Sequence, residues 1–190
     1  MFKVHQFKNY MHPLECMELR RRSSVYARSR VLEDGKVQET DIRTSSTSGV
    51  IDDDLTRMMS SKLDWFLKKE AGCEFCSSSA LQIIRYYPKQ FFHRHMDALE
   101  DDNEGNQRLY SALLYLNDDY DGGATRFENE IVIPEIGKLI VWKNVIPGTI
   151  DANYESHHSS EPVISGIKYV ALKLLYSTAP RSCLLVEDKK

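Results

Sequence analysis

The sequence lacks any apolar run that approaches the roughly 20 residues needed to cross a bilayer. Its first residues, MFKVHQFKNYMHPLECMELRRR, also lack the apolar stretch of a secretory signal. Neither charge dominates, because 25 lysines and arginines are set against 28 aspartates and glutamates, which leaves a net charge of −3. These absences give no reason to expect a membrane or a nucleic acid as partner, and we expect a cytoplasmic protein.

Cysteine is scarce. Four cysteines in 190 residues are too few for a disulfide scaffold. Cys73 and Cys76 form a C-x-x-C pair, a spacing found in zinc and redox sites. No second pair and no nearby His-x-x-x-His follows it, whereas a structural zinc normally has four protein ligands. We therefore interpret the pair as reduced thiols at a turn between a helix and a strand.

The length of 190 residues fits one domain, with 42% apolar and 28% charged residues as in ordinary globular proteins. No internal repeat or low-complexity tract is present. We expect a single domain over residues 1–190. Residues 1–78 would supply supporting helices and a hairpin or loop on the substrate side, and residues 79–180 would form the core that carries the site.

The N-terminal part predicts two helices separated by β-type sequence. Residues 12–23 favour a first helix, with Pro13 suited to its start. Residues 24–50 are rich in Ser, Thr and Val and predict a hairpin followed by a loop. The clearest helix comes next, because apolar residues then recur at helical spacing. They are Ile51, Leu55, Met58, Met59, Leu63, Phe66 and Leu67. A helix with one apolar face is expected to pack against something flat.

After residue 78 the sequence becomes β-like. Runs rich in branched and aromatic residues are separated by turn-forming segments. The runs are 81–87, 110–116, 138–142 and 168–176. Helices followed by many short strands indicate an α+β, mainly β protein, and a double-sheet jelly roll is the leading prediction. The acidic segment 100–107 is expected to be exposed and mobile.

The segment that ends in His95-Met-Asp97 carries the first chemistry. Side chains two apart in a strand point to the same face, so His95 and Asp97 can reach one metal. Two histidines and one carboxylate form the facial triad typical of non-haem iron(II) oxygenases. By the same alternation His93 shares this face and is also a candidate ligand.

The remaining ligand must come from a distant strand, and His157 and His158 are the candidates. Lys168 follows ten residues after His158 on an apolar run. A buried ammonium without an anion is costly, so the carboxylate of a bound ligand is its natural partner.

Here the sequence resembles the prolyl 4-hydroxylase-like branch of the iron(II)/2-oxoglutarate oxygenases over nearly the whole chain. The pattern Tyr-x-x-Gly-x-x-Tyr-x-x-His-x-Asp of that family aligns with the stretch from Tyr86 to Asp97, and its spacing selects His95 over His93. The pattern His-x-x-x-Pro-Val-x-x-Gly-x-Lys is complete from His158 to Lys168, which selects His158 over His157.

Further blocks of the family pattern occur in order. The segment Arg43-Thr-Ser-Ser matches a stretch upstream of the second helix. Arg108, Tyr115-Leu-Asn117 and Gly122-Gly-Ala-Thr-Arg-Phe127 match the central stretch. Pro134-x-x-Gly137 then precedes the run that ends at Trp142.

The resemblance implies a double-stranded β-helix, the jelly roll that the strand pattern also favours. It implies iron(II) held by His95, Asp97 and His158, with 2-oxoglutarate and O2 as co-substrates and ascorbate as a further candidate. Lys168 would bind the distal carboxylate of 2-oxoglutarate through charge-assisted contacts, with hydrogen bonds from Tyr86 and Thr125. The implied reaction is hydroxylation of an unactivated C–H bond by a dioxygenase of the prolyl 4-hydroxylase type.

The sequence departs from the family at three positions. Lys89 replaces Gly, Phe92 replaces a usual Tyr, and Leu174 stands where many enzymes acting on peptidyl proline carry Trp. Phe92 and Leu174 correspond to substrate-facing positions in relatives. Arg43, Phe92 and Arg108 are candidate substrate-binding residues, and Arg108 is an equal candidate for pairing within the barrel.

Several functions remain open at this point. The first is a prolyl hydroxylase acting on a protein or peptide, and the second is a hydroxylase of a free amino acid or another small molecule. A jelly roll that binds a ligand without turnover and a zinc hydrolase with the same three ligands are the remaining alternatives.

Overall fold

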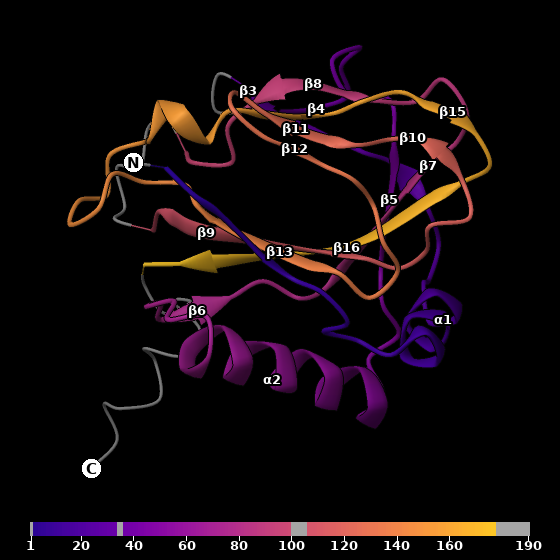
Figure 1. The fold of residues 1–190 in the computed structure, drawn as a ribbon, viewed down its shortest axis with the longest axis horizontal. Helices are drawn as coiled ribbons and strands as arrows, with labels where there is room; N and C mark the ends of the chain where they lie inside the picture. The colour runs from indigo at the N-terminus through magenta and orange to yellow at the C-terminus, as the bar shows by residue number, and fades with distance from the viewer. Residues whose placement is uncertain (1, 34–35, 100–105, 178–190) are drawn as a thin grey trace.

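The computed structural model describes residues 2–33, 36–99 and 106–177. Its strands form two facing layers, and both helices lie against the outer side of the larger layer (Figure 1). None of the described helices is long and apolar enough to span a membrane.

The larger layer is an antiparallel sheet in which distant segments are neighbours. Its order is β1-β13-β9-β16-β7-β5-β2, and β6 also pairs with β16. The strands are β1 (Val4–Phe7), β2 (Ala27–Arg28), β5 (Ser46–Gly49), β6 (Ser77–Ser78), β7 (Gln82–Tyr86), β9 (Arg108–Tyr115), β13 (Leu139–Lys143) and β16 (Lys168–Tyr176). The longest strand of this sheet, β16, lies between β9 and β7, where both of its edges are paired.

The smaller layer has the order β12-β11-β14-β8. Its strands are β8 (Phe92–His95), β11 (Thr125–Phe127), β12 (Ile131–Val132) and β14 (His158–Ser160). Two further antiparallel pairs join β10 (Asp121–Gly122) to β15 (Val163–Ser165) and β3 (Val31–Glu33) to β4 (Lys36–Gln38). Two opposed antiparallel sheets form the predicted jelly roll, so the expected fold class is confirmed.

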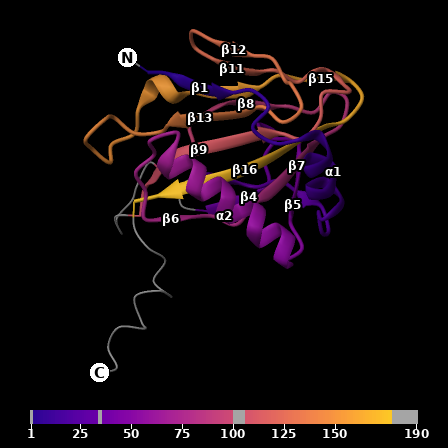
Figure 2. The same ribbon diagram turned by 60° about the horizontal axis from the view of Figure 1, so that its bottom comes forward.

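Two helices cover the larger sheet, as the apolar periodicity predicts: α1 (Pro13–Arg21) and α2 (Asp54–Lys69). Figure 2 shows α2 lying across the outer face of this sheet. The buried face of α2 includes Met59, Leu63 and Leu67, whereas Met58 is 57% exposed. The prediction that Met58 belongs to the buried face was therefore wrong. A helix that packs on one side turns some of its residues toward solvent, and Met58 is one of them.

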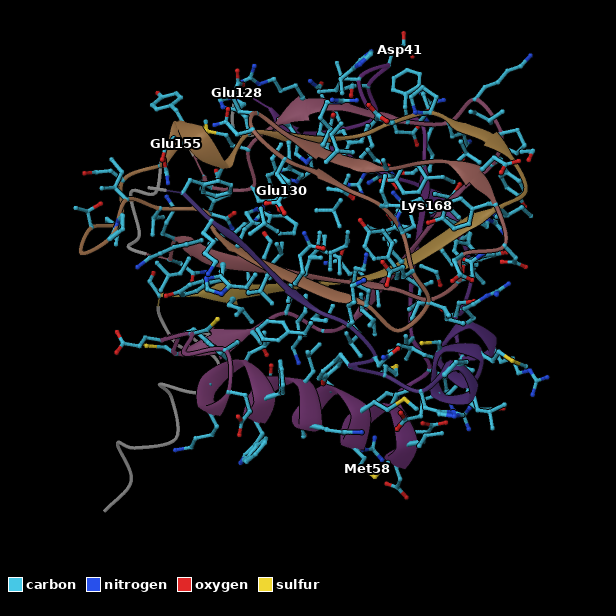
Figure 3. The ribbon with its side chains drawn as sticks, in the orientation of Figure 1. Asp41, Met58, Glu128, Glu130, Glu155 and Lys168 are labelled. Carbon is cyan, nitrogen blue, oxygen red and sulfur yellow. The ribbon has the colours of Figure 1, made fainter. Side chains whose placement is uncertain are left out.

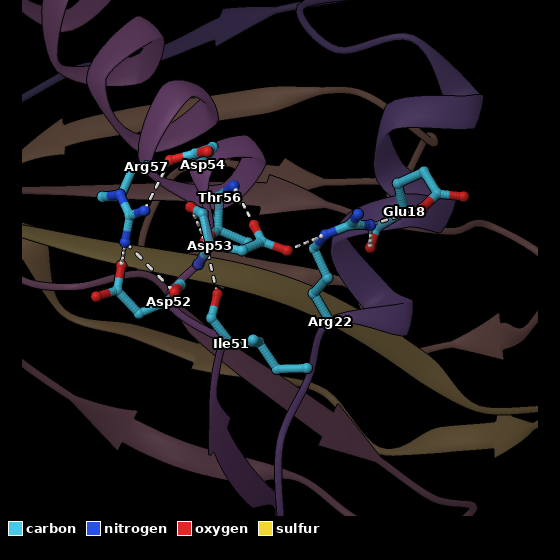
Figure 4. Close-up of polar contacts among 8 residues, drawn as sticks. All are labelled: Glu18, Arg22, Ile51, Asp52, Asp53, Asp54, Thr56 and Arg57. Carbon is cyan, nitrogen blue, oxygen red and sulfur yellow. Dashed lines mark hydrogen bonds and ion pairs between the residues drawn. The ribbon is translucent and has the colours of Figure 1, made fainter.

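Helix α2 begins three residues later than the apolar pattern suggests. Asp53 is its N-cap, and its carboxylate accepts a hydrogen bond from the backbone N–H of Thr56 at 2.8 Å (Figure 4). The Thr56 hydroxyl in turn donates to the carbonyl of Ile51, at 2.6 Å. Arg22, at the end of α1, donates to the Asp53 carboxylate at 2.8 Å, so one ion pair links the start of α2 to α1.

The molecule has two apolar cores, one on each side of the larger sheet. The outer core joins the helices to the sheet and includes Leu19, Leu67 and Leu114. The inner core lies between the two sheets and includes Tyr115 and Trp142. Because alternate residues of β9 and β13 serve different cores, these strands are apolar on both faces, which explains their continuous apolar sequence.

The four long strand predictions match β7, β9, β13 and β16 within two residues at each end. Strand β1 was not predicted, although it pairs with β13 from Val4 to Phe7. Residues 24–50 form β2, the β3–β4 hairpin and β5, more strand than the predicted hairpin and loop. Most of the acidic segment, residues 100–105, lies outside the described residues.

The described cysteines, Cys16, Cys73 and Cys76, are free. Cys73 is buried and Cys76 is exposed, between the end of α2 and the start of β6. Burial raises the pKa of the Cys73 thiol to about 11, which keeps it protonated at neutral pH. Cys183 lies outside the described residues.

Candidate metal centre and co-substrate pocket

The pairing of β8 with β14 brings two distant histidines together. His95 is the last residue of β8 and His158 is the first of β14, and the two are register partners. Asp97 follows two residues beyond the end of β8, so it reaches the site from the adjoining loop rather than from the strand. Sequence segments more than 60 residues apart therefore meet at one edge of the smaller sheet.

The three side chains converge on one point. The His95 Nε2 atom lies 3.6 Å from Asp97 Oδ1, and the His158 Nε2 atom lies 3.8 Å from Asp97 Oδ2. One ligand atom from each of the three residues lies within 4.8 Å of the other two. Neighbouring ligands of an octahedral ion with bonds of about 2.1 Å are about 3 Å apart, so a small inward movement would complete the coordination. The donor set fits iron(II).

Backbone carbonyls orient both imidazoles. His95 Nδ1 lies 2.7 Å from the carbonyl oxygen of His93, and His158 Nδ1 lies 3.0 Å from that of Ser156. A carbonyl can only accept, so each Nδ1 carries the proton and each Nε2 keeps its lone pair toward Asp97. Burial, together with the neighbouring His158, lowers the pKa of His95 to about 3, so His95 is neutral at physiological pH.

The carboxylate of Asp97 stays ionised although it is buried. Burial raises its pKa, but the adjacent His158 and His95 side chains and a hydrogen bond from Ser111 outweigh that effect, so the pKa lies below its usual value. The Ser111 hydroxyl donates to Asp97 Oδ2 at 2.6 Å. Two neutral imidazoles and one carboxylate are the protonation states that a facial triad requires.

A β-bulge in β8 corrects the prediction that His93 shares a face with His95. His158 pairs with His95 and Ser160 pairs with Phe92, so three steps along β8 match two along β14. The extra residue breaks the alternation. Phe92 and His95 consequently stack, with ring centroids 3.4 Å apart, whereas His93 is exposed and its ring lies beside Phe91.

A pocket between the two sheets joins the triad to Lys168. Its lining residues are Arg43, Ile84, Tyr86, Phe92, His95, Asp97, Leu113, Thr125, Trp142, His158, Ser159, Ser160, Lys168, Val170 and Leu172. Figure 3 shows Lys168 pointing into the space between the layers. The Lys168 side chain, the first residue of β16, is only 1% exposed.

The partners of the Lys168 ammonium are neutral. Its Nζ donates to the Gly123 carbonyl at 2.7 Å and to the Ser160 hydroxyl at 2.8 Å, and it lies 5.0 Å from the ring centre of Tyr86. Burial lowers its pKa to about 7, and the attraction of Glu161 opposes this shift. A buried cation whose hydrogen-bond partners among the described residues are all neutral is suited to receive a carboxylate, so the pocket fits 2-oxoglutarate.

The other predicted co-substrate residues also lie in this pocket. Tyr86 is the register partner of Lys168 and is 4% exposed. The Thr125 hydroxyl lies 2.7 Å from the hydroxyl of Tyr115, in a hydrogen bond that either group can donate. Tyr115 is fully buried and holds Thr125 from within the inner core.

The candidate substrate residues are divided between two places. Arg43 and Phe92 line the pocket, with the guanidinium carbon of Arg43 4.7 Å from the ring centre of Phe92. Arg108 instead donates from Nη1 to the backbone carbonyl of Asp97 at 3.3 Å, which is a contact within the fold. Leu174 is 6% exposed and lies on the same face of β16 as Lys168.

Three polar residues near the site were missed by the sequence reasoning. Ser160 contacts Lys168, and strand alternation from His158 would have indicated it. Ser111 and Asn144 lie behind Asp97, where the Asn144 amide donates to the Ser111 hydroxyl at 3.0 Å. They have no signature in the sequence, because only the tertiary structure brings them to Asp97.

Comparison with known proteins adds the family. A model described as the 2OG-Fe(II) oxygenase superfamily matches residues 81–176, slightly more than half of the chain. The chain belongs to that superfamily. The described histidine-aspartate-histidine cluster and the Lys168 pocket both lie within or beside the matched strands. The protein is therefore a 2-oxoglutarate-dependent dioxygenase that uses iron(II), 2-oxoglutarate and O2.

Individual proteins with similar sequences carry the name prolyl 4-hydroxylase. A protein of Acanthamoeba polyphaga mimivirus with the name "Putative prolyl 4-hydroxylase" is 25% identical over 89% of this chain and 72% of its own length. Prolyl 4-hydroxylase 1 of Arabidopsis thaliana is also 25% identical, over 90% of this chain and 68% of its own length.

Solved structures share its fold. A viral collagen prolyl hydroxylase from Paramecium bursaria Chlorella virus-1, determined with 2-oxoglutarate, superposes with a TM-score of 0.67 over 92% of this chain and 96% of its own, at 20% identity. A Pseudomonas putida prolyl-4-hydroxylase gives a TM-score of 0.64 over 95% of each chain, at 18% identity. At these identities the similarity establishes the jelly-roll fold alone.

Proposed function

We propose that this dioxygenase is a prolyl 4-hydroxylase that acts on proline within a protein or peptide. The observation that carries its chemistry is the buried Lys168 ammonium, which has neutral partners and shares one pocket with His95, Asp97 and His158. The choice of proline is supported by the names of the relatives, which align with about 90% of this chain.

In this proposal iron(II) is held by His95, Asp97 and His158. Lys168 binds the distal carboxylate of 2-oxoglutarate, beside the hydroxyl groups of Tyr86 and Thr125. When bound, the metal and its co-substrates supply the oxidation that converts a C–H bond into C–OH, with release of succinate and CO2. The cofactor performs this chemistry, while the protein supplies binding, orientation and shielding.

The protein shields the site with apolar walls. Ile84, Leu113 and Val170 line the pocket that also contains Lys168 and the triad. They exclude water from the Lys168 ammonium, which strengthens its attraction for a carboxylate. The same burial keeps His95 neutral and therefore able to bind metal. The pocket thus binds a carboxylate group at one end and a metal at the other.

The edge of the pocket at Arg43 and Phe92 is the proposed substrate side. Arg43 lies over Phe92, and Phe92 stacks on His95, so this edge of the pocket combines a cation with two flat rings next to a metal ligand. Arg43 also donates from Nη1 to the carbonyl of Arg30 at 3.3 Å, just before the antiparallel pair of β3 and β4. A similar structure from Trichoplax adhaerens, with a TM-score of 0.69 and 14% identity, is of a prolyl hydroxylase with a peptide fragment.

The test is a turnover assay with iron(II), 2-oxoglutarate, ascorbate and O2. Proline-rich peptides should gain one oxygen atom by mass spectrometry, with one succinate formed for each hydroxylated proline. The same peptides with alanine in place of proline serve as the matched substrate control. A His95→Ala variant serves as the enzyme control, because it lacks one proposed ligand.

Other outcomes separate the alternatives. Oxidation of free proline or another amino acid, without reaction of any peptide, would replace the peptidyl substrate with a small molecule. The Phe92 and Leu174 departures from the family pattern make this arm of the assay necessary. No succinate above the level of the His95→Ala control would favour a ligand-binding protein without turnover.

A further inference from the structure

Behind the triad, a buried serine and a buried asparagine form a polar chain to Asp97. Ser111, on β9, and Asn144, just after β13, are both 0% exposed. The Asn144 Nδ2 atom lies 3.0 Å from the Ser111 hydroxyl, which lies 2.6 Å from Asp97 Oδ2. Neither residue lines the pocket, so neither touches a bound substrate.

The direction of this chain follows from the donor inventory. A carboxylate only accepts hydrogen bonds, so the single proton of the Ser111 hydroxyl points to Asp97. The Asn144 side chain must then present its N–H group to Ser111, because the serine has no second proton to give. The Asn144 Oδ1 atom correspondingly has no partner among the described residues. Each link is polarised toward the carboxylate.

The hydrogen bond also distinguishes the two carboxylate oxygens. Oδ2 accepts the proton of Ser111, while Oδ1 has no hydrogen bond from Ser111 and lies 3.6 Å from His95 Nε2. Asp97 lies in a loop beyond β8, so the strand ladder does not set its side-chain angle. Without Ser111 the carboxylate would be free to rotate among its rotamers.

Asn144 is itself held rigidly, and it also connects to His158. Its backbone N–H donates to the Leu109 carbonyl at 2.8 Å, and its carbonyl accepts from the N–H of Asn153 at 2.8 Å. The Asn153 carbonyl then accepts from Ser156, whose own carbonyl orients the His158 ring. One residue therefore joins the supports of two ligands that come from different parts of the chain.

We infer that Ser111 and Asn144 are positioning residues that fix the Asp97 carboxylate for metal binding, with Asn144 acting through Ser111. The inference rests on the proposed metal site and adds to it the residues that hold its carboxylate in place. Groups that orient metal ligands typically contribute 10- to 100-fold in metal affinity, so an effect of roughly this size is expected.

The experiment measures Co(II) binding to the metal-free protein from the visible absorption of the complex. Ser111→Ala should bind Co(II) about 10-fold or more weakly than wild type, and Ser111→Thr, which keeps a hydroxyl group, should restore most of the affinity. Ser48→Ala is the matched control, because Ser48 is also buried and hydrogen bonded but lies on β5. The melting temperature of each metal-free variant reports folding separately.

A double-mutant cycle tests the role of Asn144. Asn144→Leu removes the amide and should weaken Co(II) binding less than Ser111→Ala does. If Asn144 acts through Ser111, the double variant should bind no more weakly than Ser111→Ala alone. This part of the inference would be overturned if the losses of Co(II) binding free energy in the two single variants add in full in the double variant.

Two results would overturn the positioning role of Ser111 or the metal site on which it rests. Ser111→Ala binding Co(II) as tightly as wild type would exclude a positioning role while leaving the metal site intact. Failure of the folded wild-type protein to bind Co(II) at all would overturn the metal site itself. The two failures are therefore distinguishable in one titration series.

Discussion

His158 lies directly opposite His95 across the β8–β14 pair, and each imidazole is oriented by the backbone carbonyl two residues before it. The two ligands thus have equivalent support, although they are far apart in the sequence. Asp97 is supported differently, by a side chain from the opposite sheet. The centre consequently depends on the packing of both layers of the jelly roll.

The two adjacent histidines, 157 and 158, should behave differently on substitution. His158→Ala should reduce succinate formation more than about 100-fold, since losing a ligand should cost more than losing a group that orients one. The His157 ring instead contacts the Tyr154 carbonyl and does not line the pocket, so His157→Ala should remain within about 3-fold. A coupled succinate assay checks both. Equal losses in the two variants would contradict the ligand assignment.

Lys168 should lower the stability of the protein in a pH-dependent way. Its folded pKa of about 7 is below its unfolded value of 10.5, so the unfolded chain binds more protons between these limits and stability rises with pH. Lys168→Met removes this cost. The variant should be more stable than wild type at pH 7, and its advantage should shrink by roughly 2 kcal/mol by pH 9.

Urea denaturation at pH 7 and pH 9 measures this difference. Added 2-oxoglutarate should stabilise metal-loaded wild type more than the methionine variant, because only wild type has the ammonium that binds the distal carboxylate. A wild type that is more stable than Lys168→Met at pH 7 in the absence of ligand would contradict the account.

Lys89 should be a source of backbone strain. Its φ angle is 71°, a left-handed conformation, at a position where the family pattern has Gly. It follows Pro88 in a turn closed by a 3.0 Å bond from Gln90 N–H to the Tyr87 carbonyl. Lys89→Gly should raise the free energy of unfolding by about 1 kcal/mol, or the melting temperature by about 2–4 °C.

Asn9 provides the matched control for this substitution. Its φ angle of 53° is also left-handed, but asparagine tolerates that region, so Asn9→Gly should be close to neutral. Calorimetry of both variants checks the prediction. A loss of stability in Lys89→Gly would indicate that flexibility gained in the unfolded chain exceeds the strain that is removed.

Gly137 should tolerate no side chain. Its φ angle is +76°, and an added Cβ would lie 2.1 Å from the carbonyl oxygen of Met11. Hydrogen bonds to Met11 and Tyr115 fix its backbone, so the clash cannot be relieved locally. Gly137→Ala should cost more than about 2 kcal/mol. Gly148 has a φ of +84° with open space around it, so Gly148→Ala should cost only about 1 kcal/mol. Similar losses at both positions, measured by denaturation, would contradict this explanation.

The sequence by itself determined helix α2, the four long strands and the candidate ligands. Helical spacing located α2, and branched residues located the four long strands, because burial against one or two cores leaves a periodic or continuous apolar pattern. The spacing of the family motifs selected His95 over His93 and His158 over His157, and it indicated Lys168 as a cation for a ligand carboxylate. These properties are local, or they repeat at fixed spacing, so they can be read along the chain.

Only the tertiary structure decided how those residues meet. The bulge in β8 moves His93 away from the pocket, and simple alternation could not reveal an extra residue whose existence depends on the pairing with β14. Ser111 reaches Asp97 only because the two sheets face each other, and Arg108 contacts the backbone carbonyl of Asp97 for the same reason. Asn144 reaches Ser111 because β13 pairs with β9. Contacts between segments distant in the chain depend on strand register and layer packing, which no single segment encodes.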